Sequence, residues 1–210
     1  MGTDAPRAAS GRLRSTDASP AQGDLRAAVE RAHPLTLRFA GPMTLDAWLA
    51  SASGRSFADW IAERSAAVPA DPDAAAVLDL ARYEAAVRRL EEGPAPERPA
   101  AGASDVDPED LVTLGRGHAV LAVATNLAEQ VEALARRARA PVRRERGVVL
   151  LARAGDEVVS AELDVLEADL VLVAERPVHA RFAVETSRDP WRARVLLRDL
   201  LATGVLERLA

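Results

Sequence analysis

Residues 147–175 read GVVLLARAGDEVVSAELDVLEADLVLVAE, and they carry the clearest signal of secondary structure in the chain. Two runs rich in β-forming residues flank Ala154-Gly155-Asp156, a short turn of the kind that joins the strands of a hairpin. The apolar run Val165–Val173 follows at once. Its length fits a strand or a helix, because a short apolar run has no decisive period. We predict a helix, since a helix after a hairpin suits the rest of the chain.

The chain closes with a helix-like stretch, Pro190–Thr203, and a last apolar run, Val205–Leu209. A hairpin packed against helices is the layout of a small winged-helix-like domain. Upstream, His118–Thr125 is a β-like apolar run, and a helix ending before Pro141 should follow Asn126. We therefore predict an α+β domain over residues 117–210.

The N-terminal part is expected to be all helical. In its longest predicted helix, from Asp73 to about Glu91, apolar residues recur at steps of three and four, the pattern of a helix with one buried side. These residues are Val77, Leu80, Tyr83, Val87 and Leu90.

A Pro- and Gly-rich segment, Gly93–Pro108, marks the predicted domain boundary. Asp107 and Pro108 then favour one short helical turn through Leu114. The expected organisation is a disordered tail (1–23), a helical domain (24–92), a linker with a short helix (93–116) and the α+β domain (117–210).

Composition narrows the function classes. The formal net charge is −5, which argues against a general binder of nucleic acid or anionic membranes. There is no cysteine, so disulfides and thiolate sites are excluded. No run approaches the roughly 18 apolar residues that cross a bilayer, and no apolar core follows the N-terminal arginines. We expect a cytoplasmic protein without a membrane segment.

Catalytic or metal-binding patterns are not recognisable. His33, His118 and His179 lie far apart, and no carboxylate stands at ligand spacing from them, which favours structural roles. The acidic segment Asp105–Asp110 lacks the glycine and final glutamate of an EF-hand loop. No nucleophile motif or phosphate-binding loop is present. We expect no metal, no cofactor and no enzyme activity of this chain alone.

Aromatic and basic side chains leave two alternatives open. Trp48, Trp60 and Trp191 have helical spacing to Leu and Ile neighbours, which favours the core, although exposed tryptophans anchor interfaces. Arginines surround the last helix, and they could contact phosphates if this were a recognition helix. The alternative for them is a solvated helix face. These residues are Arg188, Arg192, Arg194 and Arg198.

One phrase in the helical part carries a family resemblance. It reads SFADWIAERSAAVPADPDAAAVLDLARYEAAVRRL, and it contains the motif Asp79-Leu80-Ala81-Arg82-Tyr83-Glu84. With the hairpin VVLLARAGDEVVSAELD and the final LLRDLLATGVL, the chain from about Asp24 to its end resembles a group of small partner proteins. These are the partners of multinuclear non-haem iron oxidases that modify ribosomal peptides (the MbnC, HvfC, BufC and TglI group).

The resemblance implies a non-catalytic subunit that forms a heterodimer with the iron oxidase. It also implies that the C-terminal domain is similar to a peptide-recognition element and presents the leader of a precursor peptide. Any iron would be held by the oxidase.

An extended leader can add to an exposed strand edge, which offers unpaired N–H and C=O groups. We expect that edge on the second hairpin strand, flanked by the helix Trp191–Leu201, whose arginines would pair with acidic leader residues. The expected peptide-binding residues are Glu157, Val158, Val159, Ser160, Ala161, Glu162, Leu163, Arg192, Val195 and Arg198. The expected interface with the oxidase comprises Trp48, Trp60, Arg82 and Tyr83.

Two other hypotheses stay open. The first is a winged-helix transcriptional regulator that binds DNA through its last helix. The second is a stand-alone scaffold or dimerisation protein in which the hairpin is only a structural wing.

Overall fold

The structure, a computed structural model, describes residues 20–51, 54–94 and 106–209. Its first helices are α1 (Pro20–Ala32), α2 (Pro34–Ala40), α3 (Pro42–Ser51), α4 (Phe57–Ala67) and α5 (Pro72–Glu92). Then follow β1 (Leu111–Leu114), β2 (His118–Thr125), α6 (Leu127–Ala135), β3 (Arg144–Ala154) and β4 (Glu157–Glu162). The last are α7 (Val165–Val173), β5 (Val178–His179), α8 (Ala180–Glu185), α9 (Pro190–Ala202) and β6 (Leu206–Leu209). None of the helices within the described ranges is long and apolar enough to cross a membrane.

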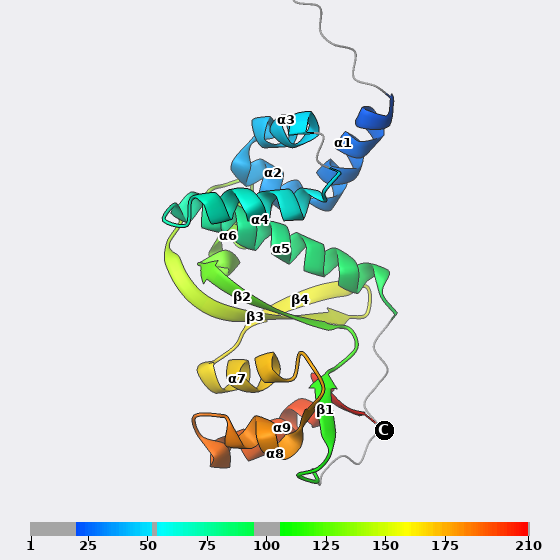
Figure 1. Ribbon diagram of the computed structural model, residues 1–210, viewed down its shortest axis with the longest axis vertical. Coiled ribbons are helices and arrows are strands. Elements are labelled where there is room, and N and C mark those ends of the chain that lie inside the picture. The colour runs from blue at the N-terminus through cyan, green and yellow to red at the C-terminus, as the bar shows by residue number, and fades with distance from the viewer. Residues whose placement is uncertain (1–19, 52–53, 95–105, 210) are drawn as a thin grey trace, which may run out of the picture.

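The predicted α+β class is confirmed: a helical region precedes a region with two small antiparallel sheets (Figure 1). The N-terminal helices pack around an aromatic cluster. The Phe57 ring lies edge-on to Trp48, with 5.7 Å between ring centroids, and stacks on Trp60 at 6.3 Å. The Ser56 side chain accepts a hydrogen bond from the Asp59 N–H, which caps α4.

The predicted hairpin is confirmed as β3 and β4. Ala154 pairs with Glu157, so the turn consists of Gly155 and Asp156. Gly155 adopts a φ of 68°, a left-handed conformation that glycine accepts without the steric cost of a side chain. The hairpin joins β2 in a sheet of order β2-β3-β4, so β4 is an outer strand.

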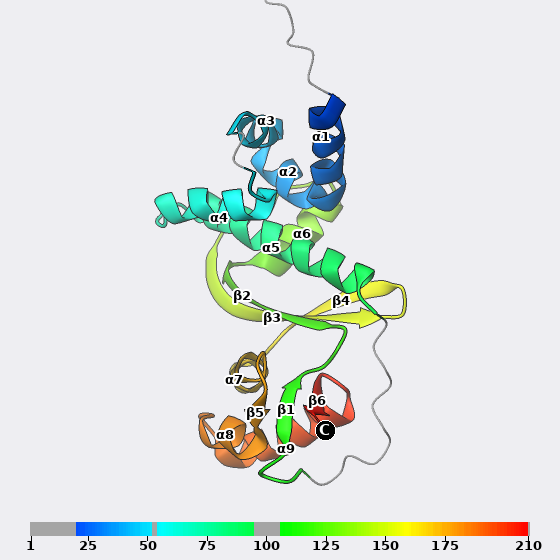
Figure 2. The same ribbon diagram turned by 45° about the vertical axis from the view of Figure 1, so that its right-hand side comes forward.

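The sheet β2-β3-β4 is covered on both faces. Val149 and Leu151 pack in a cluster with residues of α5 and α6, whereas Leu150 packs in a cluster with residues of α7 and α9. Successive strand residues point to opposite faces, which explains the unbroken apolar run of β3. The sheet is therefore a middle layer between the helical region and the C-terminal elements (Figures 1 and 2).

The C-terminal elements build a second unit with its own sheet, of order β5-β1-β6. The predicted helix over Val165–Val173 is confirmed as α7. Asp164 accepts hydrogen bonds from Leu166 N–H and Glu167 N–H, while the Glu167 side chain accepts one from Asp164 N–H. The helices α8 and α9 contact β5 and β6 of this second sheet. Residues of α7 and α9 also share a cluster with Leu150, so they cover one face of the sheet that contains the hairpin.

The prediction that a helical turn runs through Leu114 is wrong for its last four residues. A turn does form at Asp107–Asp110, with Asp110 N–H bonded to Asp107 O at 3.0 Å, but Leu111–Leu114 is a strand. It pairs with β5 on one side and with β6 on the other. The partner strands of β1 lie far along the chain, so the local residues Asp107 and Pro108 could not indicate these pairings.

The apolar clusters do not follow the expected domain boundaries, because one cluster contains residues from both sides of the linker. The boundaries stay a prediction. One cluster joins Phe39, Leu80 and Leu90 of the helical region to Leu127 and Leu151 of the region after the linker. Residues 1–19 of the expected tail and 95–105 of the expected linker lie outside the described residues. Pro20–Gly23, also placed in the tail, begin α1.

Two buried carboxylates on α5 connect it to elements on different sides. Glu84 accepts hydrogen bonds from Leu35 N–H, Thr36 N–H and the Thr36 hydroxyl, at the start of α2. Asp79 accepts hydrogen bonds from the N–H groups of residues 124 and 125 and from the Thr125 hydroxyl, at the end of β2. Each carboxylate thus satisfies donors that burial would otherwise leave unpaired.

We predict that Asp79→Ala lowers the free energy of unfolding by about 2–4 kcal/mol, because it leaves three donors at the end of β2 without their acceptor. Urea denaturation followed by circular dichroism measures this. The matched control is Glu91→Ala, which removes an exposed carboxylate from the same helix and should change stability by less than about 0.5 kcal/mol. Equal stability of the two variants would show that Asp79 does not hold the sheet to α5.

Candidate peptide-binding edge

The outer edge of β4 offers main-chain hydrogen-bonding groups. Leu163 N–H donates to Val148 O at 2.9 Å, which fixes the alternation of the β3–β4 ladder. Residues at every second position therefore bond to β3, and those between them, Val158, Ser160 and Glu162, direct N–H and C=O groups away from the sheet. Among the described residues, no other backbone group pairs with this edge.

A groove lies beside this edge, between β4, α5 and α6. Its cavity has a volume of about 210 Å³. The floor is mainly apolar, and a few polar side chains stand around it. The lining residues are Tyr83, Leu127, Ala128, Val131, Glu132, Val149, Ser160, Ala161 and Glu162. An added strand would thus have both main-chain partners and a place for a side chain.

Tyr83 connects the groove to α5. Burial raises the pKa of the Tyr83 phenol above its ordinary value, and the nearby Glu84 carboxylate acts in the same direction. A hydrogen bond to the Ser160 side chain opposes both effects. The phenol is therefore neutral at physiological pH, and its hydroxyl contacts the middle residue of β4.

Most expected peptide-binding residues lie on or beside this edge. Glu157–Glu162 form β4, and Leu163 continues the ladder by one residue. Val159 is exposed, whereas Val158 packs with the apolar cluster of α5 and α6. The groove side of α6 was not among the predicted site residues. In the sequence, Leu127, Val131 and Leu134 have helical spacing, but this spacing does not show that β4 stands opposite the helix.

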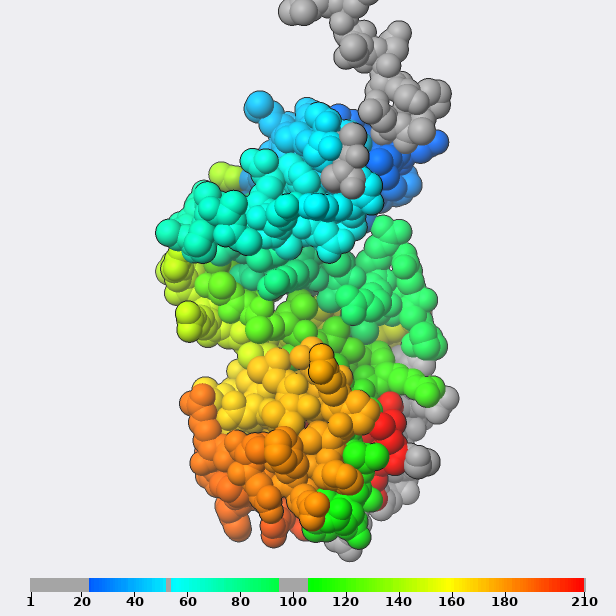
Figure 3. All heavy atoms as spheres, viewed as in Figure 1, coloured from blue at the N-terminus to red at the C-terminus, as the bar shows by residue number. Residues whose placement is uncertain are grey.

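The other expected peptide-binding residues are elsewhere. Arg192, Val195 and Arg198 are exposed on α9, which packs chiefly against α7, α8 and β6. Besides its partner strand β3, the helix α5 contacts β4. In Figure 3, α8 and α9 form the lower end of the molecule and α1–α4 the upper end. The structure therefore does not bring these α9 residues to the edge of β4.

The four residues expected at the oxidase interface differ in exposure. Trp48 and Trp60 are each 7% exposed and belong to the core of the helical region. Arg82 is exposed on α5, and Tyr83 lies half-buried in the groove. Of the tryptophans, Trp191 is the exposed one, with 76% of its surface accessible at the start of α9.

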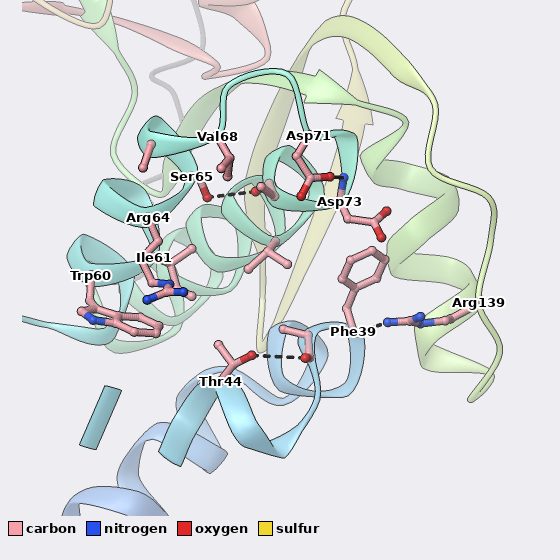
Figure 4. A pocket seen from close by; sticks show the side chains of 14 residues that line it. Phe39, Thr44, Trp60, Ile61, Arg64, Ser65, Val68, Asp71, Asp73 and Arg139 are labelled. Atoms are coloured by element: carbon pink, nitrogen blue, oxygen red, sulfur yellow. Dashed lines mark hydrogen bonds between the residues drawn. The ribbon is translucent and has the colours of Figure 1, made fainter. Parts of the chain in front are cut away.

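A larger hollow of about 530 Å³ lies between α2, α4, α5 and the segment after α6 (Figure 4). Its polar groups are largely engaged by the protein itself. Arg139 donates to Phe39 O and lies over the Phe39 ring, and the Ser65 hydroxyl donates to Ala74 O. Asp71 accepts from Asp73 N–H at the start of α5. The β4 edge differs, because its outward main-chain groups have no such partners in the described chain.

The histidines occupy three separate places. His33 is buried, with its Nδ1 3.7 Å from a Glu84 oxygen. His118 is half-buried at the start of β2, and burial lowers its pKa. His179 is exposed near Glu109. Within the described ranges, no group of three or more His, Asp or Glu side chains is arranged to hold a metal ion.

Comparison with known proteins adds no assignment. A scan against protein-family models gave no match, and a search of curated proteins gave none either.

We predict that Tyr83 ionises above pH 10, because burial disfavours the phenolate. The chain has one tyrosine and neither lysine nor cysteine, so near-ultraviolet absorbance during an alkaline titration reports Tyr83 alone. Since the raised pKa favours the protonated folded state, stability should be complete below pH 10 and fall as pH rises through the Tyr83 pKa. Tyr83→Phe should remove this part of the pH dependence. Ionisation at the ordinary value would contradict the buried position of the ring.

Proposed function

We propose that this protein is a non-catalytic adaptor that holds an extended segment of a ribosomally made precursor peptide for a partner enzyme. The observation that carries the proposal is the outward edge of β4 beside an apolar groove. The resemblance to partner proteins of multinuclear non-haem iron oxidases supports the choice of enzyme. In this proposal the oxidase forms a heterodimer with the chain, holds the iron and performs the reaction.

Binding would proceed by addition of the peptide to the sheet as a further strand. Val158, Ser160 and Glu162 each present one N–H and one C=O group, and each main-chain bond contributes about 0.5–1.5 kcal/mol net. A side chain in the groove adds about 1.5–3 kcal/mol when fully buried. These gains are offset by the cost of ordering a free peptide. The balance favours weak and reversible binding, which suits an adaptor that must release its peptide.

The edge also meets the requirements of an accessible strand. β4 ends in Glu157 and Glu162, and such charged residues keep an open edge from pairing with other copies. The face of the sheet toward α5 and α6 is apolar, so an incoming side chain on that side leaves water.

The proposal is tested by co-expressing the chain with a multinuclear non-haem iron oxidase and a precursor peptide encoded beside its gene, and by measuring complex formation. We expect a three-component complex at micromolar concentrations. Ser160→Pro should remove the precursor while the oxidase stays bound, because proline lacks the outward N–H but leaves the β3–β4 bonds intact. Ser160→Ala, which keeps that N–H, is the matched control. The proposal would be contradicted if the wild-type chain bound neither the oxidase nor the precursor peptide.

A second candidate function rests on the C-terminal unit. In this unit α8 and α9 contact strands β5 and β6 of the sheet β5-β1-β6, and Arg192, Arg194 and Arg198 are exposed on α9. Such a helix can enter the major groove of DNA, although the net charge of −5 opposes this. Electrophoretic mobility shifts with DNA from the protein's own promoter region test it. Salt-sensitive retardation that Arg194→Ala weakens would favour this function, and no retardation at low salt would exclude it.

A further inference from the structure

The charged side chains that line the groove beside β4 are all negative. Glu132 and Glu162 are among its lining residues, and that lining contains no basic side chain. The strand itself, EVVSAE, has two glutamates and no basic residue. A peptide that reaches this edge therefore meets an apolar floor with carboxylates at its border.

The two carboxylates differ in their present partners. Glu132 pairs with Arg136 one helical turn away, and both side chains are well exposed. Exposed pairs of this kind are weak, so Glu132 can exchange its partner at little cost. Glu162 forms no ion pair among the described residues. It is thus placed to pair with a cationic group that arrives with the peptide.

The ladder defines which peptide residues meet these groups. In an antiparallel addition, peptide residues directly opposite Ser160 and Glu162 exchange main-chain bonds with them and point to the same face of the sheet. That face is the one covered by α5 and α6, and the groove opens on it. A side chain opposite Ser160 would enter the space lined by Leu127, Val131 and Val149. The residue two positions away would stand opposite Glu162.

Resting on the proposed function, we infer that the β4 edge selects a segment with an aliphatic residue and, two positions away, a lysine or arginine. The aliphatic side chain fills the groove, and the cation pairs with Glu162 and Glu132. Opposite charges directly across two strands stabilise the pair, and like charges destabilise it. An acidic segment, expected when the arginines of α9 were placed beside β4, is therefore disfavoured at this edge.

The test uses the ¹⁵N-labelled full chain and blocked synthetic peptides with the core Lys-Thr-Leu-Thr-Lys. This core offers one lysine to Glu162 in either strand direction. The comparison peptides have Glu-Thr-Leu-Thr-Glu, in which the charge is reversed, and Lys-Thr-Ser-Thr-Lys, in which the groove residue is polar. Amide shifts of Val158, Ser160 and Glu162 report binding at the edge. We expect the first peptide to bind about three- to tenfold more tightly than the second, and the third to bind more weakly than the first.

Two charge-matched variants separate local pairing from attraction by the acidic chain. Glu162→Lys should reverse the preference between the lysine and glutamate peptides. Glu157→Lys makes the same charge change on the same strand but outside the groove lining, and it should keep the wild-type preference.

The outcomes distinguish this inference from the proposed function. Peptides that bind at β4 without a charge preference, or with one that Glu162→Lys leaves unchanged, would overturn the inference but leave strand addition standing. If neither the lysine nor the glutamate peptide shifts the β4 amides, and the precursor also fails to bind, strand addition itself is refuted.

Discussion

The architecture depends on two carboxylates that α5 places on different sides of its axis. Asp79 and Glu84 are five residues apart, a rotation of about 140° on an α-helix. Each accepts three hydrogen bonds, Glu84 from the start of α2 and Asp79 from the end of β2. Since a buried carboxylate without partners is costly, each requires its element to be in place. The helical layer and the sheet β2-β3-β4 are thus fastened to one helix.

The candidate site is a product of this arrangement. Tyr83 is the neighbour of Glu84 on α5, and it reaches Ser160 in the middle of β4. The groove therefore exists only where α5, α6 and β4 converge, although these elements come from three distant parts of the sequence. A hairpin alone would offer an edge but no selective space beside it. In the proposed function, the coupling of edge and groove would let this surface select a particular class of peptide.

The local sequence predicted the type of each helix and strand better than it predicted which elements pack together. The hairpin followed from the turn at Gly155, and the helix after it from an apolar run that Asp164 and Glu167 cap. The strand Leu111–Leu114 was missed because its pairing partners lie far along the chain. The same limit explains the groove: Leu127, Val131 and Leu134 have helical spacing in the sequence, but only the fold sets α6 opposite β4. It also explains α9, whose arginines were expected beside β4 but lie with the second sheet.

The position of β1 in its sheet has a consequence for synthesis on the ribosome. β1 is the central strand of β5-β1-β6, yet β6 leaves the ribosome about a hundred residues later, a long separation to close in folding. Until β5 emerges the nascent chain has a central strand with neither neighbour, and until β6 emerges one edge of β1 stays open. Such unpaired strand edges attract other chains. The whole β2-β3-β4 layer is made in this interval and can already pack on α5. β6 therefore completes this sheet about a hundred residues after its central strand is made.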